Sequence, residues 1–148
     1  MRDNLKMPMG KHKGRGVWDV MLRNPDFIAW LKEHHWDGFQ WLYEGIAELV
    51  AEFDEAPFSE VSCAGDVDGC PCTNPVTRFS IYQKTSVPVF WCEDCDPCQL
   101  GAGKAKLSVG RTYYGALNHV IDNGGGMVAK RKVIREIAVA KGFLKTRG

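Results

Sequence analysis

Six cysteines in the middle of the chain have the residue type and the spacing of metal ligands. Cysteine thiolates bind zinc tetrahedrally, and a structural site needs four of them converging from two segments. In the second segment, "WCEDCDPC", the Cys92-x-x-Cys95 spacing allows both sulfurs to face one ion. The sequence therefore predicts a structural Zn²⁺ site, and closed thiolate coordination argues against catalysis at the metal.

The first cysteine segment, "CAGDVDGCPC", leaves the ligand set open. Its spacing departs from the C-x-x-C of a zinc ribbon, so either Cys70 or Cys63 could pair with Cys72. Six sulfurs, including that of Cys98, could in principle hold two ions. Buried reduced thiols and a redox C-x-x-C are competing interpretations, although the redox motif begins a helix in a βαβ setting that is not seen here. The predicted ligands are Cys63, Cys70, Cys72, Cys92 and Cys95.

A glycine-rich basic stretch, "MPMGKHKGRG" at residues 7–16, is the second candidate for binding chemistry. Its glycines permit backbone conformations that expose amides, and its cations can neutralise phosphate oxygens without reading bases. The residue order of a Walker loop is absent. The competing interpretation is a turn in a small hairpin with solvated lysines. The predicted phosphate-contacting residues are Lys11, His12, Lys13 and Arg15.

Basic charge is concentrated at both ends of this sequence. Residues 1–16 carry a net charge of +4 and residues 127–148 one of +6, so the middle, in a chain whose total is +1, carries −9. A polyanion such as nucleic acid could contact both ends, although the ends could equally pair with the acidic middle. The predicted second contact zone consists of Lys130, Arg131, Lys132 and Arg135.

The stretch from Leu5 to Trp36 resembles a family of small modules with the approximate pattern M-P-F-G-K-h-K-G, an aspartate-containing spacer, and a helix with an aromatic residue and W-L. This module occurs at the C-terminus of exodeoxyribonuclease X-like proteins and in small stand-alone proteins of a quorum-sensing-regulated virulence factor family. Met9 stands where the family prefers an aromatic residue, and the spacer is longer here. The resemblance implies an accessory role in nucleic-acid processing, not the nuclease itself. The matching residues are Met7, Pro8, Gly10, Lys11, Lys13, Gly14, Asp19, Trp30 and Leu31.

Helical periodicity predicts two helices that follow the glycine-rich stretch. Asn24 is placed to cap the first helix, and Pro25 suits its first turn. The second helix is amphipathic from Phe39 to Phe53, because apolar residues recur every three or four positions with glutamates opposite them. Tryptophans in this part of the chain could stack on bases, although a core position is their more common role. They are Trp18, Trp30, Trp36 and Trp41.

The remaining chain reads as a β-hairpin followed by two helices. Alternating apolar and polar residues in "TRFSIYQKTSVPVFWC" predict the hairpin, with Pro88 on an edge strand. Helical spacing returns over residues 111–122 and 128–141, with Gly142 as the C-cap of the last helix. The pair resembles a helix-turn-helix, but its three-glycine turn is looser than that motif usually allows.

These elements predict an α+β fold that forms one compact unit. Residues 1–56 hold the basic glycine-rich segment and two helices, residues 57–103 a zinc-ribbon-like module, and residues 104–148 the basic helical pair. A hydrophobic fraction of 45% can support a core. No apolar run approaches the roughly 18 residues of a membrane span, and no export signal is present, so a cytoplasmic location without membrane association is expected.

Together these features predict a zinc-stabilised, non-catalytic nucleic-acid-binding accessory protein, of the type that phages or mobile elements carry, with DNA as the expected ligand. The alternative is a small regulator that docks on a polymerase or nuclease through the acidic middle of the chain. Enzyme activity is not expected, because the carboxylates are dispersed among the cysteines and no Ser/His/Asp or Cys/His arrangement follows from spacing.

Overall fold

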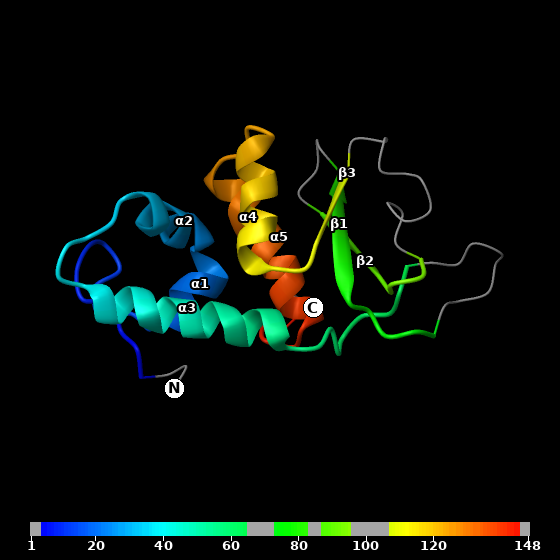
Figure 1. Ribbon diagram of the computed structural model, residues 1–148, viewed down its shortest axis with the longest axis horizontal. Coiled ribbons are helices and arrows are strands. Elements are labelled where there is room, and N and C mark those ends of the chain that lie inside the picture. Colours follow the sequence, from blue (N-terminus) through cyan, green and yellow to red (C-terminus); the bar gives the residue numbers. More distant parts are fainter. Residues whose placement is uncertain (1–3, 65–72, 83–86, 96–106, 146–148) are drawn as a thin grey trace.

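The computed structural model describes residues 4–64, 73–82, 87–95 and 107–145. Within these residues it has five helices and one antiparallel sheet, in agreement with the predicted α+β class (Figure 1). None of these helices combines the length and the apolar character that are needed to cross a bilayer. The elements are α1 (Val17–Arg23), α2 (Pro25–Glu33), α3 (Gln40–Glu55), β1 (Arg78–Tyr82), β2 (Pro88–Trp91), β3 (Leu107–Gly110), α4 (Tyr113–Asp122) and α5 (Met127–Ala140).

Helix α5 lies at the centre of the core. Its apolar side chains Val133, Ile134 and Ile137 are completely buried, and the helix packs against α1, α2, α4 and strand β2. Figure 1 shows α4 and α5 standing between helices α1 and α2 on one side and the sheet on the other, with α3 running below them. Because one face of α5 is committed to this contact, Arg131, Lys132 and Arg135 lie away from it, whereas Lys130 is on the helical face of Val133, Ile134 and Ile137.

The end of α3 is tied to two other helices, and we call this region the helix junction. The ammonium group of Lys141 donates hydrogen bonds to the carbonyl oxygens of Phe53 (2.6 Å) and Asp54 (3.2 Å). The Asp54 carboxylate accepts a hydrogen bond from the first amide of α4, that of Tyr113, at 2.8 Å. Burial lowers the pKa of Lys141 and raises the pKa of Asp54. The junction therefore satisfies backbone groups at two helix ends with two partly or largely buried charges.

The sheet has the strand order β2-β1-β3, and both strand pairs are antiparallel. Pro88 begins β2, which is an edge strand, so its predicted edge position is confirmed. Strand β3 was not predicted, because four residues are too short to display a clear alternation. Ser80 is completely buried in the central strand, and its hydroxyl accepts a hydrogen bond from the indole of Trp91 at 2.8 Å.

The helix predictions need two corrections in the N-terminal part. Residues 17–23, assigned to a spacer, form α1, so three helices precede the sheet instead of two. Gly16 provides no side-chain cap for this short helix, which is stabilised instead by the complete burial of Val17, Val20 and Met21. Asn24 does occupy the N-cap position of α2, but its side chain does not cap the helix.

Gly142, predicted as the C-cap of α5, lies one residue beyond it, because Lys141 occupies the C-cap position. Gly142 has a φ of +84°, in the left-handed region that glycine adopts without strain. The amide of Phe143 donates to the carbonyl of Ala138 at 2.9 Å, and the amide of Gly142 donates to that of Val139 at 3.1 Å. These two bonds form a Schellman motif, which ends the helix and directs Phe143 back toward the helix junction.

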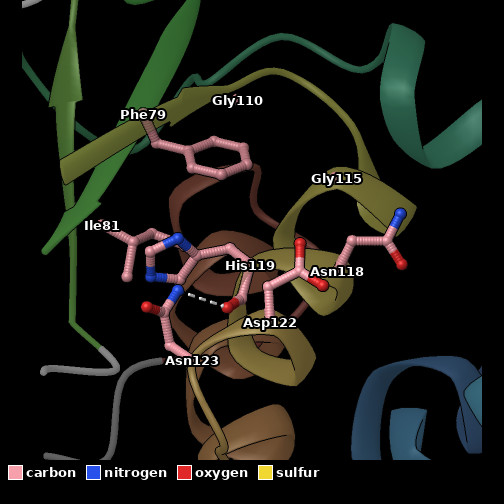
Figure 2. A pocket seen from close by; sticks show the side chains of 8 residues that line it. All are labelled: Phe79, Ile81, Gly110, Gly115, Asn118, His119, Asp122 and Asn123. Carbon is pink, nitrogen blue, oxygen red and sulfur yellow. Dashed lines mark hydrogen bonds between the residues drawn. The ribbon is translucent and has the colours of Figure 1, made fainter. Parts of the chain in front are cut away.

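The sheet meets α4 across a small hollow of about 270 Å³ (Figure 2). Phe79 and Ile81 line it from β1, and His119 and Asp122 line it from α4. The Asn123 amide also lines the hollow and donates a hydrogen bond to the His119 carbonyl at 2.8 Å, where it closes the last turn of the helix. The sequence gives no functional signal at His119, since a histidine in an apolar helix is more often packed than a ligand.

Candidate metal centre and basic groove

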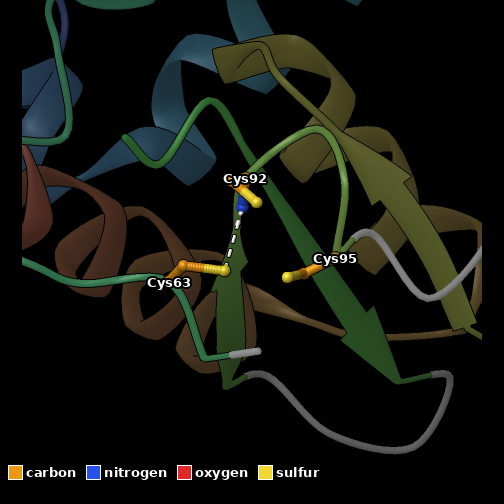
Figure 3. A group of neighbouring side chains, drawn as sticks. All are labelled: Cys63, Cys92 and Cys95. Carbon is orange, nitrogen blue, oxygen red and sulfur yellow. Dashed lines mark hydrogen bonds between the residues drawn. The ribbon is translucent and has the colours of Figure 1, made fainter. Parts of the chain in front are cut away.

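Three of the predicted metal ligands converge beside the sheet. The sulfurs of Cys63, Cys92 and Cys95 all lie within 4.8 Å of one another (Figure 3). Cys63 and Cys92 are buried, with 8% and 2% of their surface exposed, and Cys95 is half-buried. Cys63 comes from the segment before β1, whereas Cys92 and Cys95 follow β2, so the three sulfurs are supplied by two separate segments as predicted.

Backbone pairing explains why the two cysteine segments meet. The amide of Ala64, next to Cys63, donates to the carbonyl of Phe90 in β2 at 2.8 Å. The amide of Cys92 then donates to the Cys63 sulfur at 3.2 Å, and the side-chain amide of Asn74 donates to the Cys92 sulfur at 3.8 Å. These hydrogen bonds hold the two sulfurs in fixed positions beside each other, as a shared metal ion would require.

The arrangement fits a thiophilic metal ion. Zinc–sulfur bonds of about 2.3 Å place the sulfurs of a tetrahedral site about 3.8 Å apart, and the three sulfurs here lie within 4.8 Å of one another. Two further predicted ligands, Cys70 and Cys72, lie outside the described residues, as does Cys98. The structure thus brings three of the five predicted ligands together, and the cluster could hold a metal ion.

The glycine-rich stretch forms a closed hairpin-like loop. Lys6 and Gly16 pair as an isolated antiparallel bridge, and the amides of Met7 and Gly14 donate to carbonyls across the loop at 2.9 Å. Gly14 has a φ of +86°, which lets the chain reverse without strain. Since these amides are used inside the loop, the expected backbone cradle for a phosphate is not formed by them. Lys11 and Lys13 remain exposed on the outside of the loop.

Arg15 and His12 were predicted to contact phosphate, but they hold the loop against the helices. The Arg15 guanidinium donates hydrogen bonds to His12 Nδ1 (2.8 Å), Asn24 Oδ1 (2.8 Å) and Asp19 Oδ2 (2.5 Å). His12 is only 7% exposed, and its ring packs on Phe27 with centroids 4.8 Å apart. His12 is therefore a packing residue whose ring faces inward, and a phosphate contact at this position stays a prediction.

Burial of His12 predicts a specific pH dependence of stability. A guanidinium only donates, so Nδ1 accepts and Nε2 carries the proton; Nε2 is buried without a hydrogen-bond partner among the residues that the structure describes. Burial, followed by the positive charges of Arg15 and Lys11, lowers the pKa of His12 below 6.5. The unfolded chain therefore binds a proton more tightly, and the stability contribution present above pH 6.5 is lost as the pH falls through the folded pKa.

We expect urea unfolding to show that the free energy of unfolding decreases between about pH 7 and pH 5, and His12→Gln should reduce this slope. The exposed His35 provides a control, because His35→Gln should retain the wild-type slope. A slope that is unchanged in His12→Gln would contradict the prediction.

A basic groove lies between α1 and α5. A hollow of about 450 Å³ has apolar residues Leu22, Val128 and Leu144 in its lining, together with four cationic side chains. A second hollow, of about 360 Å³, shares Leu22, Arg23 and Leu144 with the first, so the two adjoin and extend the groove to Lys6. The cations of the basic groove are Lys6, Arg23, Arg131, Lys132 and Arg135.

The predicted basic residues of α5 fall into two groups. Arg131, Lys132 and Arg135 line the basic groove, whereas Lys130 is not among its lining residues. Arg131 also donates to the Asp26 carboxylate at 2.9 Å, and the Arg135 guanidinium donates to the carbonyl of Lys145 at 3.3 Å. Sequence reasoning missed Lys6 and Arg23 as groove residues, because only the packing of α1 against α5 places them there.

The chain was compared with protein-family models, curated proteins and solved structures. No family model, no curated protein and no solved structure matches the chain.

Proposed function

We propose that this chain is a zinc-stabilised, non-catalytic accessory protein that binds nucleic acid through the basic groove. The observation that carries the proposal is the concentration of cations in one groove, where α1 and α5 each contribute. Four arginine and lysine side chains line a single hollow, which is more positive charge than one small anion would neutralise and which favours a polyanion. The resemblance of residues 5–36 to a module found beside nucleases supports the same role.

The chemistry of the groove favours binding over catalysis. Asp19 is the one carboxylate among its described lining residues, and its two oxygens accept hydrogen bonds from Arg15 and Arg23. Partial burial acts to raise the pKa of Asp19, but these two hydrogen bonds outweigh it and lower that pKa. A carboxylate held ionised by two arginines is a poor general base, and one carboxylate does not make a two-metal nuclease site.

Zinc is the proposed metal because three sulfurs converge and amides donate to two of them. Its fourth ligand would come from the cysteines in residues 65–72 or 96–106. Zinc would cross-link the segment before β1 to the turn after β2 and supply no catalytic chemistry.

Fluorescence anisotropy across a salt series tests the nucleic-acid part of the proposal. Labelled single- and double-stranded DNA should bind the wild-type protein with an affinity that falls steeply from about 50 to 200 mM salt. Lys132→Ala and Arg135→Ala should each make the logarithmic salt slope shallower by about 0.9 for every duplex phosphate that the variant no longer neutralises.

Arg111→Ala is the matched control, because Arg111 is an exposed cation outside the basic groove. It should leave the salt slope close to that of the wild-type protein. Absence of salt-dependent binding, or an equal change in Arg111→Ala, would overturn the proposal and favour a protein-docking role.

A further inference from the structure

The turn between α2 and α3 gathers aromatic side chains on the molecular surface, and we call residues 27–43 the aromatic corner. Trp30 and Trp41 are 41% and 49% exposed, and His34 and His35 are also exposed. Large aromatic side chains are usually buried. A cluster of them on the surface commonly marks a binding site. Their arrangement indicates what this surface can bind.

Three rings of the corner form a parallel column that begins in the core and ends at the surface. The buried ring of Phe27 stacks on Trp30 with centroids 5.6 Å apart and planes 10° apart. Trp30 stacks in turn on His34, with centroids 4.6 Å apart and planes 14° apart. His34 Nδ1 donates to the Trp30 carbonyl at 3.0 Å, so the last ring is fixed in orientation.

A second stack begins at the next residue. The ring of His35 stacks on Tyr43 of α3, with centroids 4.3 Å apart and planes 20° apart. The Tyr43 hydroxyl accepts a hydrogen bond from the Trp36 amide at 2.7 Å, which fixes this stack to the turn. Two successive exposed imidazoles therefore each lie on an aromatic ring of the protein. Such rings are preorganised, so a planar ligand would not have to order them.

The glycine-rich loop, which carries two exposed lysines, packs against the aromatic corner. A Cβ atom on Gly10 would be 3.5 Å from Phe27 Cζ and 3.6 Å from Trp36 Cη2, so the loop backbone contacts the corner directly. Figure 1 shows this loop and the α2–α3 turn together at the end of the molecule opposite the sheet. Lys11 and Lys13 are exposed and flank His12, whose ring packs on Phe27 of the corner, so this part of the loop brings two positive charges to the same end of the molecule.

Resting on the proposed function, we infer that the aromatic corner binds single-stranded nucleic acid, with unpaired bases stacked on His34 and His35 and backbone phosphates beside Lys11 and Lys13. Bases in a duplex are covered on both faces by their neighbours, so only unpaired bases can extend a ring column. Asp37 is exposed in the same turn and would repel phosphates, which places the backbone on the side of the loop lysines.

The test compares three labelled oligonucleotides of one length: a single strand, its duplex, and a strand with abasic sites. Wild-type protein should prefer the intact single strand. His34→Ala/His35→Ala should weaken single-strand binding by about 30-fold or more, since two base–aromatic stacks are lost, and leave duplex binding unchanged. His34→Phe/His35→Phe keeps two aromatic rings and should restore most of the affinity, and circular dichroism should show that both variants are folded.

The outcomes separate this inference from the proposed function. The inference is overturned if the abasic strand binds as well as the intact one, or if the alanine variant binds the single strand normally. In either case the salt dependence of Lys132→Ala still tests binding through the basic groove. If no oligonucleotide binds, both the inference and the proposed nucleic-acid-binding function are overturned. Quenching of tryptophan fluorescence by a proline-rich peptide, with none by the intact strand, would overturn the inference in favour of peptide binding.

Discussion

Cys92→Ser is expected to abolish metal binding and to unfold the sheet. Cys92 is 2% exposed and lies where the two cysteine segments meet, with its amide bound to the Cys63 sulfur. The described part of this module buries few large apolar residues, mainly Phe58, Val76, Phe79 and Ile81, so its own core contributes little stability. The free energy of zinc binding would therefore be folding free energy, and its loss should destabilise the sheet by on the order of 5 kcal/mol or more.

Elemental analysis should find one zinc per wild-type chain and none in Cys92→Ser. Circular dichroism and amide hydrogen exchange should show loss of the sheet in the variant and in chelator-treated wild type, with α1, α2 and α3 less affected. Asn74→Ala provides a graded control, because removing one hydrogen bond to the Cys92 sulfur should weaken metal affinity about 10- to 100-fold without abolishing it. A sheet that survives chelation would contradict the prediction.

Phe53→Ala is expected to destabilise the helical part by about 3–5 kcal/mol. The Phe53 ring is 1% exposed and stacks on Phe143 with centroids 5.6 Å apart. It also meets Tyr113 of α4 edge-on at 5.3 Å and lies 4.9 Å from the buried ammonium of Lys141. A single truncation at this position removes packing from three helices and leaves a cavity beside a buried charge.

Chemical denaturation followed by tryptophan fluorescence measures this loss. Trp41→Ala serves as the control, because Trp41 belongs to the same helix but is 49% exposed, and its loss should change stability by only about 0.5 kcal/mol. Similar losses in the two variants would show that the helix junction is not a centre of stability.

Long periodic segments could be predicted from the sequence, and short ones could not. The amphipathic pattern from Phe39 to Phe53 became α3, and the patterns after residue 110 became α4 and α5. Helix α1 has seven residues and strand β3 has four, so tertiary packing contributes most of their stability. Val17, Val20 and Met21 do have helical spacing, but a pattern of this length is equally consistent with a loop.

In the candidate site, sequence spacing predicted some residue positions, whereas others depend on packing between elements. The spacing of Cys92 and Cys95 predicted that both bind one metal ion, and the structure confirms that their sulfurs lie together with that of Cys63. Spacing could not show that His12 turns inward, because this depends on Phe27 in a different element. Nor could it place Arg23 in the basic groove, which exists only after α1 and α5 pack together.

The central position of α5 has a consequence for how the protein folds as it is synthesised. Helices α1 to α4 precede α5 in the sequence, yet the buried faces of α1, α2 and α4 pack on it. A ribosome would therefore release these helices with their apolar faces still exposed to water until α5 follows. The core would therefore fold only after α5 has been synthesised. Until then the nascent chain would be a substrate for chaperones that bind apolar segments.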